Sequence, residues 1–396
     1  MNNRQAFSDE YNCNFDLKIN RADSSSLKYD GRQDMFDNST VIPLWVADMD
    51  FAAPAAVTRA LSERSIHPIY GYTLFPDSLY ESLIEWLAQS HGWHGVRREW
   101  IVMCPGVVPS LHASSMAFSK PNESIIVQPP VYFPFFSAVT TTGRNLVLNP
   151  LLIKNNRYTI DFDQLEECAK RARILFLCSP HNPVGRVWNE KELKNIIRIS
   201  KKNNLIIFSD EIHADLVFSE NKHQMLAALA EDPTNIITAV APSKTFNIPG
   251  LNLSALIIPS EKHRNLINNV FETLHINASN PFSIVAFEAA YREGRPWLLK
   301  LLPYLQDTRD FVEQYLRDHL PKIRLIKPEG TYLLWLDCRK LGMKDTELHN
   351  FFVNKAGVGM SPGTIFGEGG SGFMRMNIGT PRHIITDALE NIKKAL

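Results

Sequence analysis

Two side chains in this sequence, one lysine and one carboxylic acid, have the types that covalent amine chemistry requires. Lys244 stands in the run Ser-Lys-Thr-Phe-Asn at residues 243–247, and Asp210 stands in Ser-Asp-Glu-Ile-His at residues 209–213. A lysine amine can bind an aldehyde as an imine, and a buried carboxylate can keep a pyridine nitrogen protonated so that the ring withdraws electrons. The pair therefore predicts pyridoxal 5'-phosphate (PLP), which carries both groups.

Each of these residues follows a short, strongly apolar run. Residues 236–240 read Ile-Ile-Thr-Ala-Val ahead of Lys244, and residues 205–208 read Leu-Ile-Ile-Phe ahead of Asp210. Such runs predict buried strands, and ligands of open α/β sheets bind at the carboxyl ends of the strands. Lys244 and Asp210 are thus expected to face one site. Taken singly, Lys244 would be interpreted as a solvated surface lysine and Asp210 as a helix cap or turn acid.

The middle of the chain alternates β-rich runs with helical patterns, which is typical of a parallel sheet with crossover helices. Strands are predicted at 101–103, 124–128, 146–148, 174–178, 205–208, 236–240 and 253–258. Helices are predicted between them at 110–119, 162–171, 190–202 and 225–230. Past Pro281 the pattern changes, which indicates a smaller α+β domain. It has helices at 282–292 and 296–319, strands at 323–326 and 332–336, and a last helix from Pro381.

Six motifs follow one another over most of the chain. They are Trp-Val-Ala-Asp-Met-Asp-Phe at 45–51, Tyr-Gly-Tyr at 70–72, Gly-Val-Val-Pro at 106–109, Ser-Pro-His-Asn-Pro-Val-Gly at 179–185, and the runs at 209–213 and 243–249. Together they resemble the fold-type I PLP-dependent enzymes of the aminotransferase class I and II superfamily. Within it, the narrower resemblance is to the MalY/PatB group of cystathionine β-lyase-like C–S lyases.

The resemblance implies an α/β fold, the fold-type I PLP-dependent transferase fold, in three parts. Residues 1–55 are expected to form an N-terminal segment that joins the small domain. Residues 56–290 are expected to form a large PLP-binding domain with a mixed, mostly parallel sheet, and residues 291–396 a smaller α+β domain. The resemblance also implies a homodimer in which each active site lies between two subunits.

The turn at residues 106–110 is the expected phosphate end of the site. Its sequence Gly-Val-Val-Pro-Ser lies between a predicted strand and a predicted helix, so its N–H groups and the helix dipole can receive a phosphate. By itself the pattern fits a plain strand-to-helix turn as well. The resemblance implies phosphate contacts at Val107, Val108 and Ser243, and at Tyr72 reaching over from the neighbouring subunit.

Three further residues are expected at the PLP ring. Tyr132 matches the aromatic residue that stacks on the pyridine face in the family, although its surroundings also fit a core aromatic. Asn182 follows a predicted strand, and its amide can donate to the phenolic oxygen of PLP, whereas Asn-Pro is also a common turn dipeptide. The resemblance adds His213 to the cofactor contacts. Ala241 stands where many enzymes of this fold carry a hydroxyl, so weaker PLP retention is expected.

Arg375 is the predicted substrate anchor. It alternates with apolar residues within 372–379, and its planar fork of donors suits a bidentate bond to an α-carboxylate. An arginine on such a strand can also simply face solvent. The resemblance implies the carboxylate-binding role for Arg375 and adds Asn182 and Trp45 to the substrate contacts.

The resemblance to the C–S lyases implies an α,β-elimination at these residues. The substrate amine would displace Lys244, Arg375 would bind the carboxylate, and Lys244 would remove the Cα proton while Asp210 keeps the ring nitrogen protonated. Loss of a thiolate from Cβ then gives the thiol and leaves aminoacrylate, which water hydrolyses to pyruvate and ammonia. The resemblance places Tyr72 in the catalytic set and indicates a cystathionine β-lyase-like enzyme acting on cystathionine or related L-cysteine S-conjugates.

Two other functions remain open in the sequence. An aminotransferase shares every step up to removal of the Cα proton, and PLP-binding motifs do not separate the two, although the motifs at 45–51 and 70–72 favour the lyase. The fold could alternatively serve as a regulatory or protein-binding module. The joint presence of Lys244, Asp210, Asn182 and Arg375 argues against that function.

The composition is that of an ordinary globular protein. Lys plus Arg equals Asp plus Glu at 42 each in 396 residues, so no net field favours nucleic acid or an anionic membrane. The first residues are polar and no later run approaches the ~20 apolar residues of a membrane span, so a cytoplasmic location is expected. Five scattered cysteines are interpreted as reduced thiols and His91-x-x-His94 as a surface helix end, so no metal is predicted.

Overall fold

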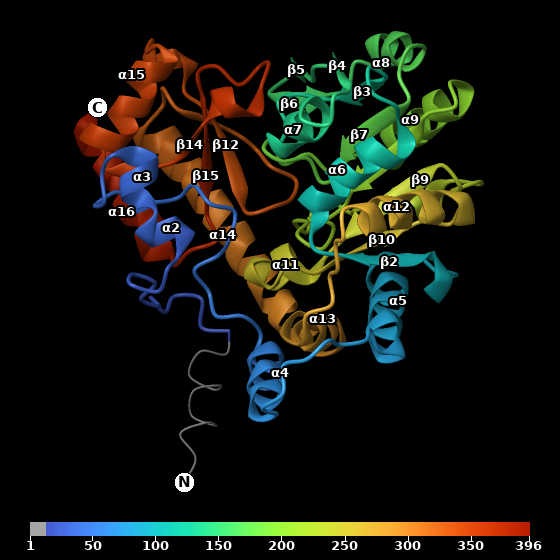
Figure 1. Cartoon of the computed structure of the whole chain (residues 1–396). Helices are drawn as coiled ribbons and strands as arrows, with labels where there is room; N and C mark the ends of the chain where they lie inside the picture. The colour runs from blue at the N-terminus through green and yellow to red at the C-terminus, as the bar shows by residue number, and fades with distance from the viewer. Residues whose placement is uncertain (1–12) are drawn as a thin grey trace.

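A seven-stranded mixed sheet forms the centre of the larger part of the molecule (Figure 1). The computed structural model describes residues 13–396, and residues 1–12 of the expected N-terminal segment lie outside that range. The strand order is β2 (Ile101–Cys104), β10 (Ser254–Ile257), β9 (Ile236–Val240), β8 (Ile206–Asp210), β7 (Ile174–Cys178), β3 (Ser124–Val127) and β4 (Asn145–Leu148). β10 runs opposite to all the other strands of this sheet, so the expected mixed, mostly parallel sheet is confirmed.

Alternation along the strands divides the core of this sheet between its two faces. Phe176 and Phe208 pack in one cluster with the helices α6 (Val107–Phe118), α7 (Pro134–Thr140) and α12 (Glu261–Thr273). Leu177 and Ile207, one residue away in each strand, pack in the other cluster with α8 (Phe162–Ala169) and α9 (Glu190–Lys202). Both faces are covered, which explains why the central strands read as continuous apolar runs.

Three helices pack together at the end of the sheet nearest β2. They are α4 (Ala55–Ile66), α5 (Asp77–His91) and α13 (Pro281–Glu293), with α13 in contact with both others. His91 closes α5 as predicted, but the prediction that it lies at the surface is wrong. Its side chain is only 7% exposed. Its Nε2 lies 2.7 Å from a carboxylate oxygen of Asp215, a residue far away in the sequence whose side chain is also 7% exposed.

A second, smaller sheet carries the C-terminal part of the chain. Its antiparallel strands are β11 (Arg324–Ile326), β12 (Leu333–Asp337), β15 (Phe373–Asn377) and β14 (Ser361–Pro362). The helices α14 (Arg295–His319) and α16 (Arg382–Ala395) contact each other here, and the N-terminal helices α2 (Leu27–Asp30) and α3 (Arg32–Phe36) lie on the same side of the molecule (Figure 1). The pairing of β1 (Ile42–Pro43) with β13 (Val358–Gly359) joins this N-terminal segment to the C-terminal part.

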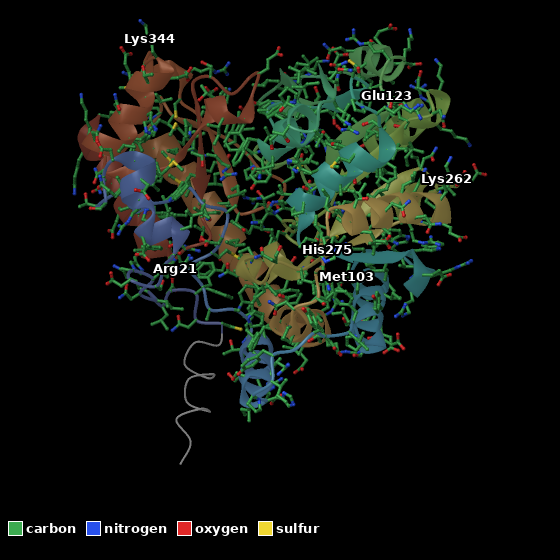
Figure 2. All side chains as sticks on the ribbon, viewed as in Figure 1. Arg21, Met103, Glu123, Lys262, His275 and Lys344 are labelled. Carbon is green, nitrogen blue, oxygen red and sulfur yellow. The ribbon has the colours of Figure 1, made fainter. Side chains whose placement is uncertain are left out.

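The coil that follows α3 crosses from the small sheet towards the large one. Its residues Asp48 and Asp50 are bound by Arg21, which projects from the coil before α2 (Figure 2), and Asp50 also forms an ion pair with the buried Lys28. No helix within residues 13–396 combines the length and the apolar character needed to cross a bilayer. In the same range, no three His, Cys, Asp or Glu side chains gather as metal ligands would.

Candidate active site

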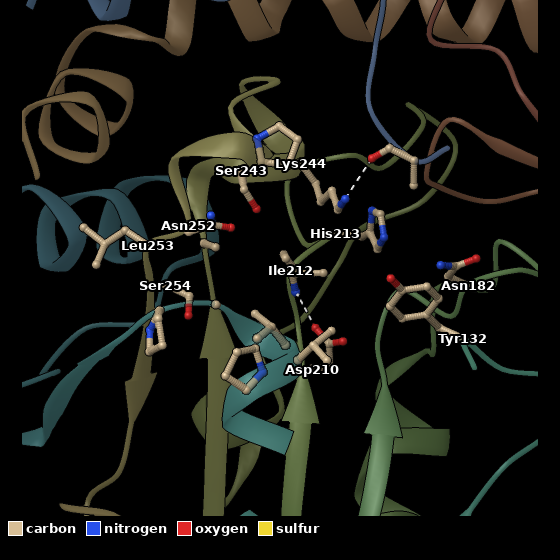
Figure 3. Close-up of a pocket in the computed structure, with 18 of the residues that line it drawn as sticks. Tyr132, Asn182, Asp210, Ile212, His213, Ser243, Lys244, Asn252, Leu253 and Ser254 are labelled. Carbon is tan, nitrogen blue, oxygen red and sulfur yellow. Dashed lines mark hydrogen bonds between the residues drawn. The ribbon is translucent and has the colours of Figure 1, made fainter. Parts of the chain in front are cut away.

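A cavity of about 250 Å³ opens where the strands β7, β8 and β9 end (Figure 3). Most of the predicted cofactor residues line it together: Val107, Val108, Tyr132, Asn182, Asp210, His213, Ser243 and Lys244. They come from five separate segments, each of which enters the site directly after a strand of the large sheet. The structure therefore brings these strand ends together at one cavity, and the roles of the residues there stay predictions.

Asp210 ends β8 and lies at the floor of the cavity. It is buried, and its Oδ1 accepts a hydrogen bond of 3.2 Å from the backbone N–H of Ile212. Burial raises its pKa to about 7, while this hydrogen bond and the charge of Lys244 act in the opposite direction. A carboxylate in such surroundings is stabilised by a cationic partner, which a protonated pyridine nitrogen would supply.

Lys244 lies on the short helix α11 (Pro242–Thr245), which follows β9 after a single residue. Its Nζ donates a hydrogen bond of 2.8 Å to the backbone carbonyl of Ala47 (Figure 3). Burial lowers the pKa of the Lys244 amine to about 8, with Asp48 and Asp210 acting in the opposite direction. A substantial part of the amine is therefore neutral near pH 8, as attack on an aldehyde requires.

The phosphate end of the cavity is built on the first turn of α6. Gly106 precedes this helix with φ +139°, a conformation that favours glycine, and Val107 and Val108 of the first turn line the cavity. Free N–H groups at the start of a twelve-residue helix attract an anion. Ser243 adds a hydroxyl, whereas Ala241 lines the cavity without one, as the sequence indicates.

Arg375 lies on β15 beside the cavity and is 4% exposed. Its Nη1 donates to Asn182 Oδ1 at 3.2 Å and its Nη2 donates to the Trp45 carbonyl at 2.7 Å, while its Nε has no partner. No acidic side chain among residues 13–396 forms an ion pair with it, and burial lowers its pKa to about 10. A buried guanidinium without an anion is a receptor for a carboxylate.

His213 follows β8 and faces the cavity with an unsatisfied nitrogen. Its Nδ1 is buried and has no hydrogen-bond partner within the described part of the chain. Burial and the charges of Lys244 and Arg375 lower its pKa to about 3, so the imidazole is neutral. A neutral imidazole with a free nitrogen suits a contact with a polar group of a cofactor.

Besides Arg375, two more predicted residues do not line the cavity. Tyr72 is fully exposed (106%) and does not line the cavity of its own chain. The indole of Trp45 packs against Phe36 and donates to the Lys28 carbonyl, so within this chain only the backbone oxygen of Trp45 reaches Arg375.

Four residues contribute to the site although the sequence motifs assigned them no role in it. The carbonyl of Ala47 accepts a hydrogen bond from Lys244, and the hydroxyl of Tyr332 donates to the same oxygen. Asn377 Nδ2 donates to the carbonyls of Val46 and Asp48, on either side of Ala47, and Asn247 Oδ1 accepts from the N–H of Met49. The motif at 45–51 was recognised, but its contribution through backbone atoms is visible only in the structure.

Comparisons with known proteins agree with this geometry. The model of the aminotransferase class I and II family matches residues 39–392. Cystathionine beta-lyase PatB of Bacillus subtilis (strain 168) is 40% identical over 386 residues, which cover 97% of this chain and 100% of PatB.

Two solved structures are similar over almost their whole length. A PLP-bound protein of Clostridium difficile 630 has a TM-score of 0.95 and 40% identity, covering 96% of this chain and 99% of its own. The PLP-bound C-S lyase of Staphylococcus hominis, in complex with L-cycloserine, has a TM-score of 0.89 and 34% identity, covering 96% of this chain and 98% of its own.

Proposed function

The chain belongs to the aminotransferase class I and II family, and from that premise we propose that it is a PLP-dependent carbon–sulfur β-lyase. It acts on cystathionine or related L-cysteine S-conjugates and releases a thiol, pyruvate and ammonia. The main observation in favour of an amino-acid substrate is the buried Arg375 guanidinium. It has no acidic partner within residues 13–396 and lies beside the cavity of Lys244 and Asp210. The similarity to PatB and to the C-S lyase carries the choice of elimination.

The residues present fit PLP at both ends and on both sides of its ring. The N–H groups of Val107 and Val108 and the Ser243 hydroxyl would hold the phosphate, and Asp210 would bind the pyridine nitrogen. Tyr132 lies along the cavity wall where its ring would stack, and Asn182 and His213 offer polar groups to the phenolic oxygen. When bound, PLP withdraws electrons from the substrate's Cα, which makes the Cα proton acidic.

Three side chains of the protein then divide the work on the substrate. Arg375 binds the α-carboxylate through its fork, with Asn182 beside it at 3.2 Å, and so fixes which bond at Cα faces the lysine. The neutral amine of Lys244 takes the Cα proton as the general base. As the Cβ–S bond breaks, its electron pair leaves with sulfur, and the proton on Lys244 can pass to the thiolate to give the thiol.

A homodimer with shared active sites completes the proposal. The segment before α5 exposes a row of large apolar side chains: Ile66, Ile69, Tyr70, Tyr72 and Leu74. Such an exposed apolar segment is typical of a surface that another subunit covers. A second copy of this chain, placed as the family resemblance implies, would bring Tyr72 to its partner's phosphate site. The Trp45 contact to substrate and the cytoplasmic location are further parts of the proposal.

The test is to mix the PLP-loaded protein with L-cystathionine without a keto acid and to measure pyruvate and free thiol together. Equal release of both is the expected result. If neither appears and amino transfer begins only when a keto acid is added, the protein is an aminotransferase, the second function that this family allows. A Lys244→Ala variant that keeps its full effect in cells would instead favour a regulatory or protein-binding module.

A further inference from the structure

The segment Trp45 to Phe51, here called the strap, crosses the site without forming a helix or strand. Most of its carbonyl groups accept hydrogen bonds from side chains instead of from the backbone of a helix or strand. Arg375 donates to Trp45, Asn377 Nδ2 donates to Val46 and Asp48 at 2.5 and 2.6 Å, and Asn247 Nδ2 donates to Met49 and Phe51 at 2.9 and 2.7 Å. The strap is thus fixed between β15 of the small sheet and the residues just after Lys244.

The carbonyl of Ala47, in the middle of the strap, accepts two hydrogen bonds. Lys244 Nζ and the Tyr332 hydroxyl each lie 2.8 Å from this oxygen. Lys244 belongs to the large part of the molecule, whereas Tyr332 directly precedes β12 of the small sheet. A carbonyl oxygen has two lone pairs, so these two donors saturate it.

The surroundings of the Tyr332 side chain restrict its movement. The side chain is 1% exposed, and its ring packs edge-on against His213 with centroids 6.3 Å apart. Burial raises the pKa of Tyr332 well above its ordinary value, so the hydroxyl keeps its proton and remains a donor throughout the working pH range.

We propose that Tyr332 is a positioning residue for Lys244, because its hydroxyl shares the Ala47 carbonyl and so weakens the bond that holds the lysine away from the cofactor. Two donors on one oxygen place two positive hydrogen atoms close together, and each bond is weaker than it would be alone. The amine must leave Ala47 to reach the PLP aldehyde and, later, the Cα proton. The inference rests on the role of Lys244 in the proposed function.

The charged and titratable groups around Lys244 are the same with and without the Tyr332 hydroxyl. Four groups face the amine: Asp48 on the strap, Asp210 at the end of β8, Arg375 on β15 and the neutral His213. Since none of them is removed by Tyr332→Phe, a change in the titration of Lys244 reports the shared carbonyl. With one donor gone, the bond from the ammonium form to Ala47 strengthens, which favours the charged form.

The experiment is competitive labelling of the PLP-free protein with acetic anhydride between about pH 6 and pH 10, with the Lys244 peptide quantified by mass spectrometry. In Tyr332→Phe we expect the midpoint of labelling to move up by about half a pH unit. The rate at which PLP recombines with the protein at pH 7 should fall about threefold, because less of the amine is neutral. Neither readout requires lyase activity, so this test can fail independently of the proposed function.

Tyr158→Phe is the matched control. Tyr158 is also buried, but its hydroxyl accepts a hydrogen bond of 3.0 Å from Trp335, whereas that of Tyr332 donates to Ala47. This variant should leave the Lys244 midpoint where it is in the wild type. Tyr332→Leu, which also lacks the hydroxyl, should shift the midpoint upwards like Tyr332→Phe. An unchanged midpoint would make Tyr332 purely structural, and a lowered one would make it an acceptor for Lys244; both results overturn the proposal.

Discussion

Replacing Asp210 by asparagine should change the stability of the PLP-free and the PLP-bound protein in opposite directions. Asparagine has nearly the same shape and keeps an oxygen for the N–H of Ile212, which lies 3.2 Å from Asp210 Oδ1. The substitution therefore removes a negative charge and little else. In the PLP-free protein that charge is buried at a cost, whereas with PLP bound it would face a protonated pyridine nitrogen.

The size of the effect follows from the pKa of Asp210. Burial raises it from 3.8 to about 7, a difference of about three units, and each unit corresponds to about 1.4 kcal/mol. Because the folded-state pKa is the higher one, this carboxyl favours unfolding increasingly as the pH rises from about 4 to 7. Above pH 7 the unfavourable contribution is complete, at up to about 4 kcal/mol, and below about pH 4 it vanishes.

Thermal unfolding of the PLP-free proteins at two pH values measures this contribution. With an unfolding entropy of about 2.1 cal/mol/K per residue over 396 residues, 4 kcal/mol corresponds to a Tm that is higher by up to about 5 °C for Asp210→Asn at pH 8. At pH 4 the two proteins should unfold at the same temperature. With PLP, the variant should bind the cofactor less tightly and lose about tenfold or more in kcat, as expected for a lost charge-assisted hydrogen bond of about 1.5–3 kcal/mol.

A PLP-free Asp210→Asn protein that melts below the wild type at pH 8 would refute the reasoning. The same holds if the difference between the two proteins does not change with pH. Either result would mean that the carboxylate is well solvated or already paired in the fold, and that its burial does not make it a receptor for a cation.

Three further predictions concern substrate, cofactor and assembly. Arg375→Lys keeps the positive charge but loses the two parallel donors of the guanidinium. In steady-state kinetics, KM for cystathionine should therefore rise about tenfold or more, with a smaller change in kcat. Equal KM values for the variant and the wild type would contradict the carboxylate-binding role of Arg375. Ala241→Ser should lower the dissociation constant of PLP in a fluorescence titration, because Ala241 lines the cavity and a hydroxyl there adds a phosphate contact; an unchanged constant would dismiss this explanation. If sites are shared, mixing inactive Tyr72→Ala and Lys244→Ala dimers should restore activity as hybrids form, whereas no recovery would place each site within one chain.

Hydrophobic patterning was sufficient for the central sheet and failed where the pattern was ambiguous. Strands such as β7 and β9 are buried on both faces, so their sequences are continuous apolar runs that predict strands directly. The helix α7 was missed because its sequence Pro-Phe-Phe-Ser-Ala-Val-Thr is rich in aromatic and β-branched residues, and tertiary packing decides its conformation. The helix α12 was also missed, although Ser260 caps it by accepting from the N–H of His263.

The part of the site that consists of side chains within recognisable sequence motifs was predictable. Lys244 and Asp210 could be placed together because Asp210 ends one strand and Lys244 closely follows another strand of the same sheet, and the structure brings them to one cavity. The contributions of Ala47 and Tyr332 were not predictable, since one acts through a backbone oxygen and the other through a hydrogen bond to that oxygen from a distant part of the chain. The burial of His91 was missed for the same reason, because its partner Asp215 comes from another part of the chain.

Burial is the common cause of the electrostatics of this site, and it acts on three groups in a way that favours ligands. It raises the pKa of Asp210 to about 7 and lowers those of Lys244 and Arg375 to about 8 and about 10. Each shift measures how poorly the fold alone stabilises the charged form. A pyridinium nitrogen would offset the first, imine formation would remove the second charge, and an α-carboxylate would offset the third. The three ligand groups belong to PLP and an amino acid, so the protein is expected to be more stable with both bound than without them. We therefore expect PLP to raise Tm and a substrate analogue to raise it further.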